Sequence, residues 1–217
     1  MKLHGFFRST ASYRVRVTLA LKGIAHDNCY YVLRKGETRT SEYLGMNPQG
    51  LVPTLECDDG RVLTQSLAIC EYLEEIHPDP SILPADPYDK ARVRALSQVI
   101  ACDVHPVQNL KILFRVRDLA EAGGKQDGTQ AMNEWAASTI REGLAAFDAL
   151  CAESSGRFSH GDTVTLADIC LVPQLVNARR FGVDYAALWP RLAAIEANCL
   201  TLDAFASSRP EVQPDAE

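Results

Sequence analysis

Residues 6–17 read FFRSTASYRVRV, and this stretch decides how the beginning of the chain folds. A predicted strand, Lys2–Phe6, runs into it and ends in a polar turn. A helix is predicted over Ala11–Lys22, because Val15, Leu19 and other apolar residues recur at helical spacing. Three hydroxyl side chains stand where that helix begins: Ser9, Thr10 and Ser12.

The start of a helix carries unpaired backbone N–H groups and the positive end of the helix dipole. Such a position stabilises an anion and lowers the pKa of a thiol. A serine hydroxyl beside it can donate a hydrogen bond to a sulfur anion. The simpler alternative is that Ser9 or Thr10 only caps the helix, as hydroxyl residues often do.

The first eighty residues alternate between strand and helix patterns. The predicted order is strand, helix, strand, helix, strand, strand, helix, which is typical of an α/β layer with a parallel pair and a hairpin edge. Beyond the first strand and helix, the predicted segments are a strand over Asn28–Leu33, a loop with a short helix over Arg34–Tyr43, a strand opened by Val52–Leu55, a hairpin turn at Asp58–Gly60, a returning strand at Arg61–Leu63 and a helix over Ser66–His77.

Two backbone features of this region indicate binding. Pro53 stands at the start of an inner strand, where a proline is often cis. In the cis form it would turn the Val52 backbone outward to pair with an extended peptide. Gln65 and Ser66 begin another helix, which offers a second site for a carboxylate, although a plain cap is the favoured explanation of these two residues taken alone.

Strand patterns nearly vanish after the proline-rich segment 81–87, which is interpreted as a linker between residues 1–80 and an all-helical domain, residues 88–217. The predicted elements are a helix over Pro87–Ala120 interrupted near His105-Pro106, a loop over Ala122–Gly128, a helix over Thr129–Ala152, a capping box at Thr165–Asp168 that opens a helix reaching Arg180, a helix over Trp189–Ala206 and a fraying tail, Ser207–Glu217.

Composition excludes several classes of protein. The 217 residues are 47% hydrophobic and carry a formal net charge of −6, which suits a globular protein and disfavours a nucleic-acid partner. No apolar run is long enough to span a membrane, and the N-terminus enters a strand without a signal-peptide core. The seven cysteines form no C-x-x-C pair, so neither a disulfide framework nor a metal site is predicted, and a reducing cytoplasm is expected.

Taken together, these motifs resemble those of the glutathione transferases, and specifically the zeta class. The class signature resembles Arg-Ser-Ser-Cys-x-x-Arg-Val-Arg, and Arg8–Arg16 reads RSTASYRVR. Val52–Leu55 and Gln65–Ile69 match the family's cysteinyl-backbone and γ-glutamyl sites. The resemblance extends over essentially the whole chain. It implies a thioredoxin-like α/β domain followed by an all-α domain, which is the glutathione transferase fold.

The resemblance also implies roles for individual residues. Glutathione would be the cofactor, with its sulfur hydrogen-bonded by Ser9. The other glutathione contacts would come from Thr10, Ala11, Val52, Pro53, Gln65, Ser66, His105, Asn109 and Lys111. Arg8 and Arg180 would bind the carboxylate of the substrate. Arg179 is expected to be solvated. A purely structural role competes with binding at two of these positions. A lone histidine such as His105 is usually structural, and a cation such as Arg180 stabilises a helix C-terminus in any case.

Two positions depart from the family pattern. Ala11 replaces the signature cysteine, so any step that needs that thiol is absent. Leu51 stands where some relatives carry a glutamine, which removes one polar contact to glutathione.

The reaction implied is glutathione-dependent cis–trans isomerisation of maleylacetoacetate to fumarylacetoacetate, in aromatic amino-acid catabolism, by a cytoplasmic homodimer. Three alternatives stay open: isomerisation of maleylpyruvate, conjugation of glutathione to electrophiles such as α-haloacids, and a binding module without catalysis. Asp103–Pro106 and the missing cysteine favour the hypothesis that the substrate is maleylpyruvate. Leu110-Lys111 disfavours it, since enzymes of that kind carry two arginines there.

Overall fold

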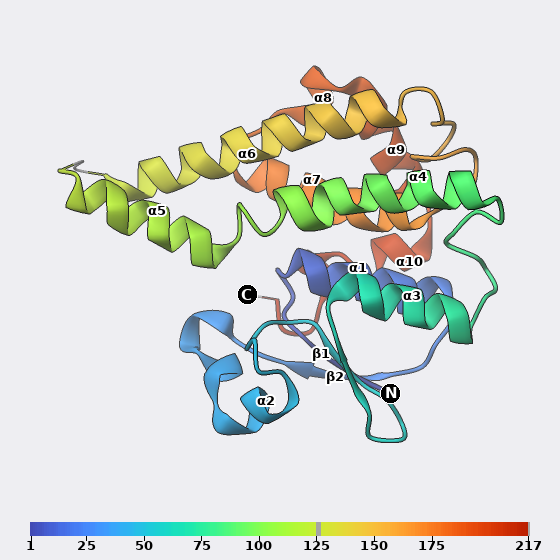
Figure 1. The fold of residues 1–217 in the computed structure, drawn as a ribbon, viewed down its shortest axis with the longest axis horizontal. Coiled ribbons are helices and arrows are strands. Elements are labelled where there is room, and N and C mark those ends of the chain that lie inside the picture. Colours follow the sequence, from blue (N-terminus) through green and yellow to red (C-terminus); the bar gives the residue numbers. More distant parts are fainter. Residues whose placement is uncertain (125–126, 217) are drawn as a thin grey trace. The chain divides into compact units, whose positions relative to one another are not determined.

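The computed structural model describes residues 1–124 and 127–216, which form two compact units. Unit 1 comprises Met1–Ile82 together with Leu200–Glu217, and unit 2 comprises Leu83–Cys199 (Figure 1). The sequence assigned 88–217 to one helical domain, so the structure differs from that division at the C-terminus. Part of the predicted loop, residues 125–126, lies outside the described residues.

Unit 1 is built on a four-stranded sheet with the strand order β2-β1-β3-β4. Its strands are β1 (Lys2–Gly5), β2 (Asp27–Tyr30), β3 (Thr54–Glu56) and β4 (Val62–Thr64). β1 and β2 are parallel, whereas β1–β3 and β3–β4 are antiparallel. This arrangement has the parallel pair and the hairpin edge that the sequence predicts. β1 and β2 end earlier than expected, whereas β4 extends one residue further, to Thr64.

Two helices pack together on one face of this sheet, and a third lies on the other side (Figure 1). They are α1 (Thr10–Leu21) and α3 (Ser66–Ile76) on the first face and α2 (Ser41–Met46) opposite, preceded by the 3₁₀ turns η1 (Leu33–Lys35) and η2 (Glu37–Arg39). Leu3, Leu19 and Leu55 are fully buried in the resulting core. Burial of such side chains contributes roughly 1.5–3 kcal/mol each.

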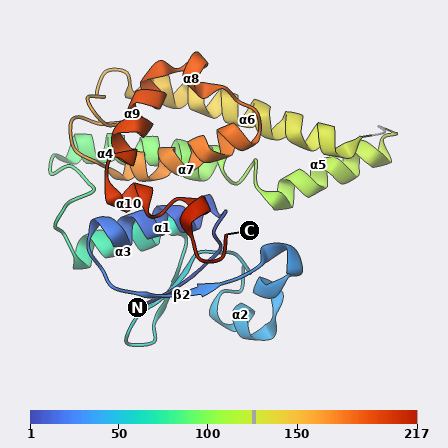
Figure 2. The same cartoon turned by 180° about the vertical axis from the view of Figure 1, so that it is seen from behind.

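The end of the chain returns to unit 1 as the short helices α10 (Asp203–Ala206) and η4 (Pro210–Val212). α10 packs against α1, and the segment that follows, red in Figure 2, lies on the same unit. The prediction that Ser207–Glu217 frays is therefore wrong for the described part of the tail. Ser208 and Pro210 are buried, and the guanidinium of Arg16 donates two hydrogen bonds to the Ser208 carbonyl, each 3.1 Å long.

The described part of unit 2 is built from helices and their connecting loops, with one isolated β-bridge between Ser155 and Gly161. The helices are α4 (Pro87–Gln98), the π-helical segment η3 (Val99–Val104), α5 (Leu110–Ala122), α6 (Gly128–Cys151), α7 (Leu166–Arg180), α8 (Tyr185–Leu188) and α9 (Pro190–Leu200). α7 is buried almost throughout its first three turns and packs on α4. Gly143 allows α6 to approach η3, since a Cβ there would lie 2.0 Å from Val104 Cγ2.

The interruption predicted near His105-Pro106 is confirmed. The His105 N–H bonds to the Ile100 carbonyl, a wider turn than that of an α-helix, and α5 begins only at Leu110. A proline in this position lacks the N–H that would continue the helix. The predicted helix Trp189–Ala206, in contrast, is two helices, α9 and α10, separated at Thr201-Leu202. None of the described helices is long and apolar enough to cross a bilayer.

Candidate functional site

The register of the sheet brings three predicted segments of unit 1 to one edge. His4 pairs with Thr54 across β1 and β3, and Thr54 pairs with Thr64 across β3 and β4. The end of β1, the start of β3 and the end of β4 therefore meet at the same side. Because these strand ends connect directly to Ser9, Val52-Pro53 and Gln65-Ser66, the sheet gathers those groups there.

Ser9 is the N-cap of α1, and its side chain is also available to a ligand. Its Oγ accepts a hydrogen bond of 3.1 Å from the Ser12 N–H, which fixes the direction of the hydroxyl oxygen. Accepting this bond uses one lone pair and leaves the hydroxyl hydrogen to donate. The side chain is partly exposed, so the capping interpretation and the binding interpretation are compatible.

The neighbours of Ser9 differ in how accessible they are. Thr10 is 4% exposed and Ala11 is 9% exposed, because both begin the buried face of α1. Arg8 precedes the cap and is exposed, with its guanidinium 4.9 Å from the centre of the Phe7 ring. Of these predicted residues, Ser9 and Arg8 are the two with substantial access to solvent.

The Val52–Pro53 peptide bond is cis, as expected from the sequence. Pro53 is buried and Val52 is partly exposed. Within residues 1–124 and 127–216, no hydrogen bond reaches the Val52 backbone N–H or carbonyl. The preceding Leu51 carbonyl, in contrast, accepts bonds from Tyr43 and Asn47. Val52 thus offers a donor and an acceptor to an extended partner.

Gln65 precedes α3 in a backbone conformation that residues other than glycine rarely adopt, with φ at +71°. Its amide nitrogen donates to the Gln49 Oε1 at 2.9 Å, and the side chain is exposed. Strained backbone of this kind costs about 1–3 kcal/mol and often marks functional sites. Ser66 is buried and opens the helix.

Arg14 is a member of this group that the sequence reasoning missed. Its NH1 donates to Ser66 Oγ at 3.2 Å, which ties the second turn of α1 to the first turn of α3. The side chain is 2% exposed, and its Nε and NH2 have no hydrogen-bond partner among the described residues. A buried guanidinium with unpaired donors is costly unless an anion or water completes it. Its place inside the motif RSTASYRVR was the available signal.

The predicted residues of unit 2 lie around the break between η3 and α5. Asn109 is the N-cap of α5, and its Oδ1 accepts from the Leu110 N–H at 2.8 Å, so it has a structural role. Lys111 is exposed and His105 is partly buried. Gln108 is 3% exposed with no partner for its Oε1 among the described residues. These four side chains thus lie within the seven residues from His105 to Lys111, around the break.

Arg179 and Arg180 end α7, and both are exposed. Arg179 is exposed, as expected, but it is also paired: its NH1 lies 2.8 Å from Glu196 Oε1 and bonds to Tyr185. Burial and the bond to Glu196 raise the pKa of Tyr185 to about 12. The Arg180 guanidinium lies 5.6 Å from the Phe181 ring centre.

The edge of unit 1 offers three different kinds of contact: a hydroxyl donor at a helix start, an unpaired backbone N–H and C=O, and a second helix start with a buried guanidinium. These suit a small peptide that presents a thiol and a carboxylate. Helix starts favour anions, so the sulfur and the carboxylate would both be stabilised there.

Comparisons with known proteins agree with this chemistry. Residues 8–76 match the family model of the glutathione S-transferase N-terminal domain, and residues 113–195 match that of the C-terminal domain. The chain is 49% identical to a maleylacetoacetate isomerase of Rhizobium meliloti, over 96% of this chain and 95% of that protein.

Two solved structures are similar over the full length of both chains. One is the holo structure of maleylpyruvate isomerase, described as a bacterial zeta-class glutathione S-transferase, with a TM-score of 0.92 and 43% identity. The other is a maleylacetoacetate isomerase of Methylobacterium extorquens AM1 with bound malonate and glutathione, with a TM-score of 0.92 and 39% identity. The chain therefore belongs to the glutathione S-transferase family, and its full-length relatives place it in the zeta class.

Proposed function

We propose that this chain is a glutathione-dependent cis–trans isomerase that converts maleylacetoacetate to fumarylacetoacetate. The observation that carries the proposal is the geometry of Ser9: it caps α1, is partly exposed, and keeps its hydroxyl hydrogen free of the cap bond. A chain of this family, nearly half identical to a maleylacetoacetate isomerase, has in Ser9 the donor that a thiolate requires.

The residues at the sheet edge fit glutathione. We assign the sulfur to Ser9, with Thr10 and Ala11 beside it. The Val52 backbone, set by Pro53, would pair with the cysteinyl residue. Gln65 and Ser66 would hold the γ-glutamyl carboxylate, and the two unpaired donors of Arg14 add positive charge beside Ser66.

When bound, glutathione supplies a thiolate that adds to the cis double bond, permits rotation about the resulting single bond and departs to leave the trans isomer. The chain's own contribution is to lower the pKa of the thiol and so to raise the fraction that is thiolate at neutral pH. A pKa lowered by one unit corresponds to about 1.4 kcal/mol. The dipole of α1 and one hydrogen bond from Ser9 are together of that size.

An anionic maleyl substrate needs a cation. We propose Arg180 for the substrate carboxylate, since a guanidinium binds carboxylates in a bidentate manner. Arg8, exposed one residue before the cap, is the second candidate. We also propose glutathione contacts for His105, Asn109 and Lys111, with Asn109 keeping its capping bond.

The replacement of the signature cysteine by Ala11 limits the mechanism. Ala11 is buried and apolar, so it neither donates a hydrogen bond nor exchanges a proton. In this chain, Ser9 and the helix start must therefore support the thiolate without a neighbouring protein thiol.

The decisive experiment measures isomerisation of maleylacetoacetate with and without glutathione, alongside maleylpyruvate and an α-haloacid. We expect turnover of maleylacetoacetate only with glutathione, and no net consumption of glutathione. Conjugation without isomerisation would refute the proposal. Binding of glutathione without turnover of any substrate would instead favour a non-catalytic binding module.

Maleylpyruvate is the second candidate substrate. The specific observation in its favour is the similarity to a maleylpyruvate isomerase over the whole of both chains. A kcat/KM for maleylpyruvate above that for maleylacetoacetate would reverse the assignment while leaving the mechanism unchanged.

We further propose a cytoplasmic homodimer. All seven cysteines, which lie within the described residues, are free thiols, and five of them are buried, as suits a reducing compartment. Light scattering of the purified protein tests the assembly, with twice the mass of 23.9 kDa expected.

A further inference from the structure

The loop that presents Ser9 is held from behind by the far end of the chain. Phe7 N–H donates to Asp215 Oδ2 at 2.9 Å, and the Phe7 carbonyl accepts from Arg16 NH2 at 3.1 Å. Both polar groups of the Phe7 backbone are thus fixed. The Ser9 N–H, two residues later, closes a turn onto the Phe6 carbonyl at 3.0 Å.

Arg16 connects this loop to the tail. Its guanidinium bonds to Phe7 and also to the Ser208 carbonyl, and it stacks 5.5 Å from the centre of the Tyr13 ring. Tyr13 in turn donates to the Phe205 carbonyl at 3.0 Å. Burial lowers the pKa of Arg16 to about 10, against the opposing effect of Asp215, so Arg16 stays cationic at neutral pH.

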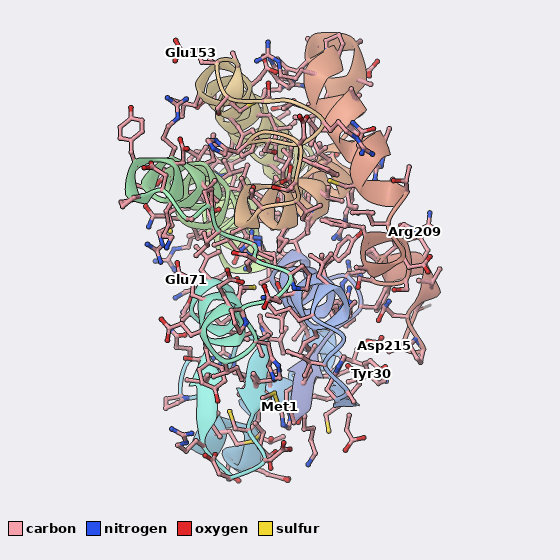
Figure 3. All side chains as sticks on the ribbon, turned by 90° about the vertical axis from the view of Figure 1, so that its right-hand side faces the viewer. Met1, Tyr30, Glu71, Glu153, Arg209 and Asp215 are labelled. Carbon is pink, nitrogen blue, oxygen red and sulfur yellow. The ribbon has the colours of Figure 1, made fainter. Side chains whose placement is uncertain are left out.

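Asp215 lies at the end of this arrangement, beside Tyr30, the last residue of β2 (Figure 3). One carboxylate oxygen is used by Phe7, and the other is buried with no hydrogen-bond partner among the described residues. Partial burial of a carboxylate that makes only one hydrogen bond is unfavourable, because it loses hydration. What this carboxylate does in exchange is to fix the loop before Ser9.

We infer that Asp215 is a positioning residue for the glutathione site: by holding the Phe7 N–H, with Arg16 holding the Phe7 carbonyl, it sets the direction in which Ser9 presents its hydroxyl. Asp215 then belongs functionally to the start of α1. The inference rests on the proposed function, since it assigns Asp215 to the same thiolate site.

Three variants of the full chain test the inference: Asp215→Ala, Asp215→Asn and Glu211→Ala. Asparagine keeps an oxygen that accepts the Phe7 N–H, whereas alanine does not. Glu211 is an exposed acidic residue of the same tail and serves as the matched control. The readouts are kcat, KM for glutathione, the melting temperature and the pKa of the bound thiol. The thiol pKa is measured from the ultraviolet absorbance of the thiolate as a function of pH.

For Asp215→Ala we expect kcat to fall about tenfold, because small displacements at a reacting centre cost one to two orders of magnitude. The bound-thiol pKa should rise toward that of free glutathione, and KM should change less than about twofold. Asp215→Asn should restore both values, and Glu211→Ala should match the wild type. A wild-type kcat and thiol pKa in Asp215→Ala, or a lower melting temperature as its sole change, would overturn the inference. A wild type without glutathione-dependent turnover would instead refute the proposed function.

Discussion

The first turns of α1 and α7 are both capped by hydroxyl residues, and they differ in what the cap leaves available. At α1, Ser9 Oγ accepts one backbone bond and remains partly exposed. At α7, Asp168 is fully buried and accepts bonds from Ser159 N, Thr165 N and Thr165 Oγ1 at 2.7, 2.8 and 3.0 Å. The same kind of cap is thus left open in one unit, where we propose that it binds the thiolate, and is closed in the other.

This difference shows that the role of a capping residue depends on whether the polar groups around it are already hydrogen-bonded. The groups at α7 satisfy one another, and burial raises the pKa of Asp168 in spite of its three bonds. The groups at α1 and α3 are left incomplete: the Ser9 hydroxyl hydrogen, the Val52 backbone and two nitrogens of Arg14. Incomplete polar groups at a helix start indicate a ligand, whereas completed ones indicate a structural role.

The largest expected effect is on stability, at the closed start of α7. Asp168→Ala should lower the free energy of unfolding by about 4 kcal/mol, because it strands two buried N–H groups at about 1–3 kcal/mol each and removes the cap. Thermal denaturation would show a melting temperature lower by about 10 °C. Asp184→Ala at the exposed cap of α8 is the control and should cost about 1 kcal/mol. Equal effects of the two substitutions would break the comparison.

Next comes the open start of α1. Ser9→Ala should reduce kcat about 100-fold or more, the loss typical when one donor to a developing or resident anion is removed. Its effect on unfolding should be only about 1 kcal/mol, because a single cap bond is lost. Steady-state kinetics and calorimetry on the same sample separate the two effects. Undiminished turnover would mean that Thr10 or water serves the sulfur.

A smaller effect is expected at α3, where the positive φ of Gln65 is unfavourable for any residue but glycine. Gln65→Gly should raise KM for glutathione about tenfold through the loss of the side chain. It should also make the chain about 0.5 kcal/mol more stable, by relieving backbone strain in excess of the added chain entropy. Gln65→Ala is the matched control, because it removes the side chain but keeps the strain. A glycine variant less stable than the alanine variant would show that the strain is absent.

The smallest effect is expected at Thr10, the neighbour of Ser9. Thr10→Val preserves the shape of the side chain and removes the hydroxyl. Because Thr10 is 4% exposed, we expect a change in kcat of about threefold or less, which is about 0.65 kcal/mol. A loss as large as that of Ser9→Ala would assign the sulfur contact to Thr10.

Local patterns in the sequence predicted most of these elements. The strand before Ser9, the cis Pro53, the capping box at Thr165–Asp168 and the break at His105-Pro106 each depend on residues close together in the chain. Helix periodicity and turn chemistry are sufficient for such features.

The features that the sequence did not predict depend on partners far away in the chain. The tail was predicted to fray, but the Ser208 carbonyl accepts a hydrogen bond from Arg16, which is 192 residues away in the chain. The bond from Arg14 to Ser66 joins two helices that are separated in the chain by β2, α2, β3 and β4. The final helix was predicted as one, because its composition is uniform across Leu200, where the chain passes from unit 2 to unit 1. Local periodicity carries no information about such contacts.

The measurement that tests the central claim most directly is the pKa of the glutathione thiol bound to the wild type and to Ser9→Ala. Thiolate absorbance is followed as a function of pH under saturating glutathione, with Ser207→Ala, an exposed serine of the same unit, as the control. We predict a wild-type pKa at least about one unit below that of free glutathione, and a shift back by about one unit in Ser9→Ala. An identical thiol pKa in both proteins would contradict the claim that the start of α1 ionises the sulfur through Ser9.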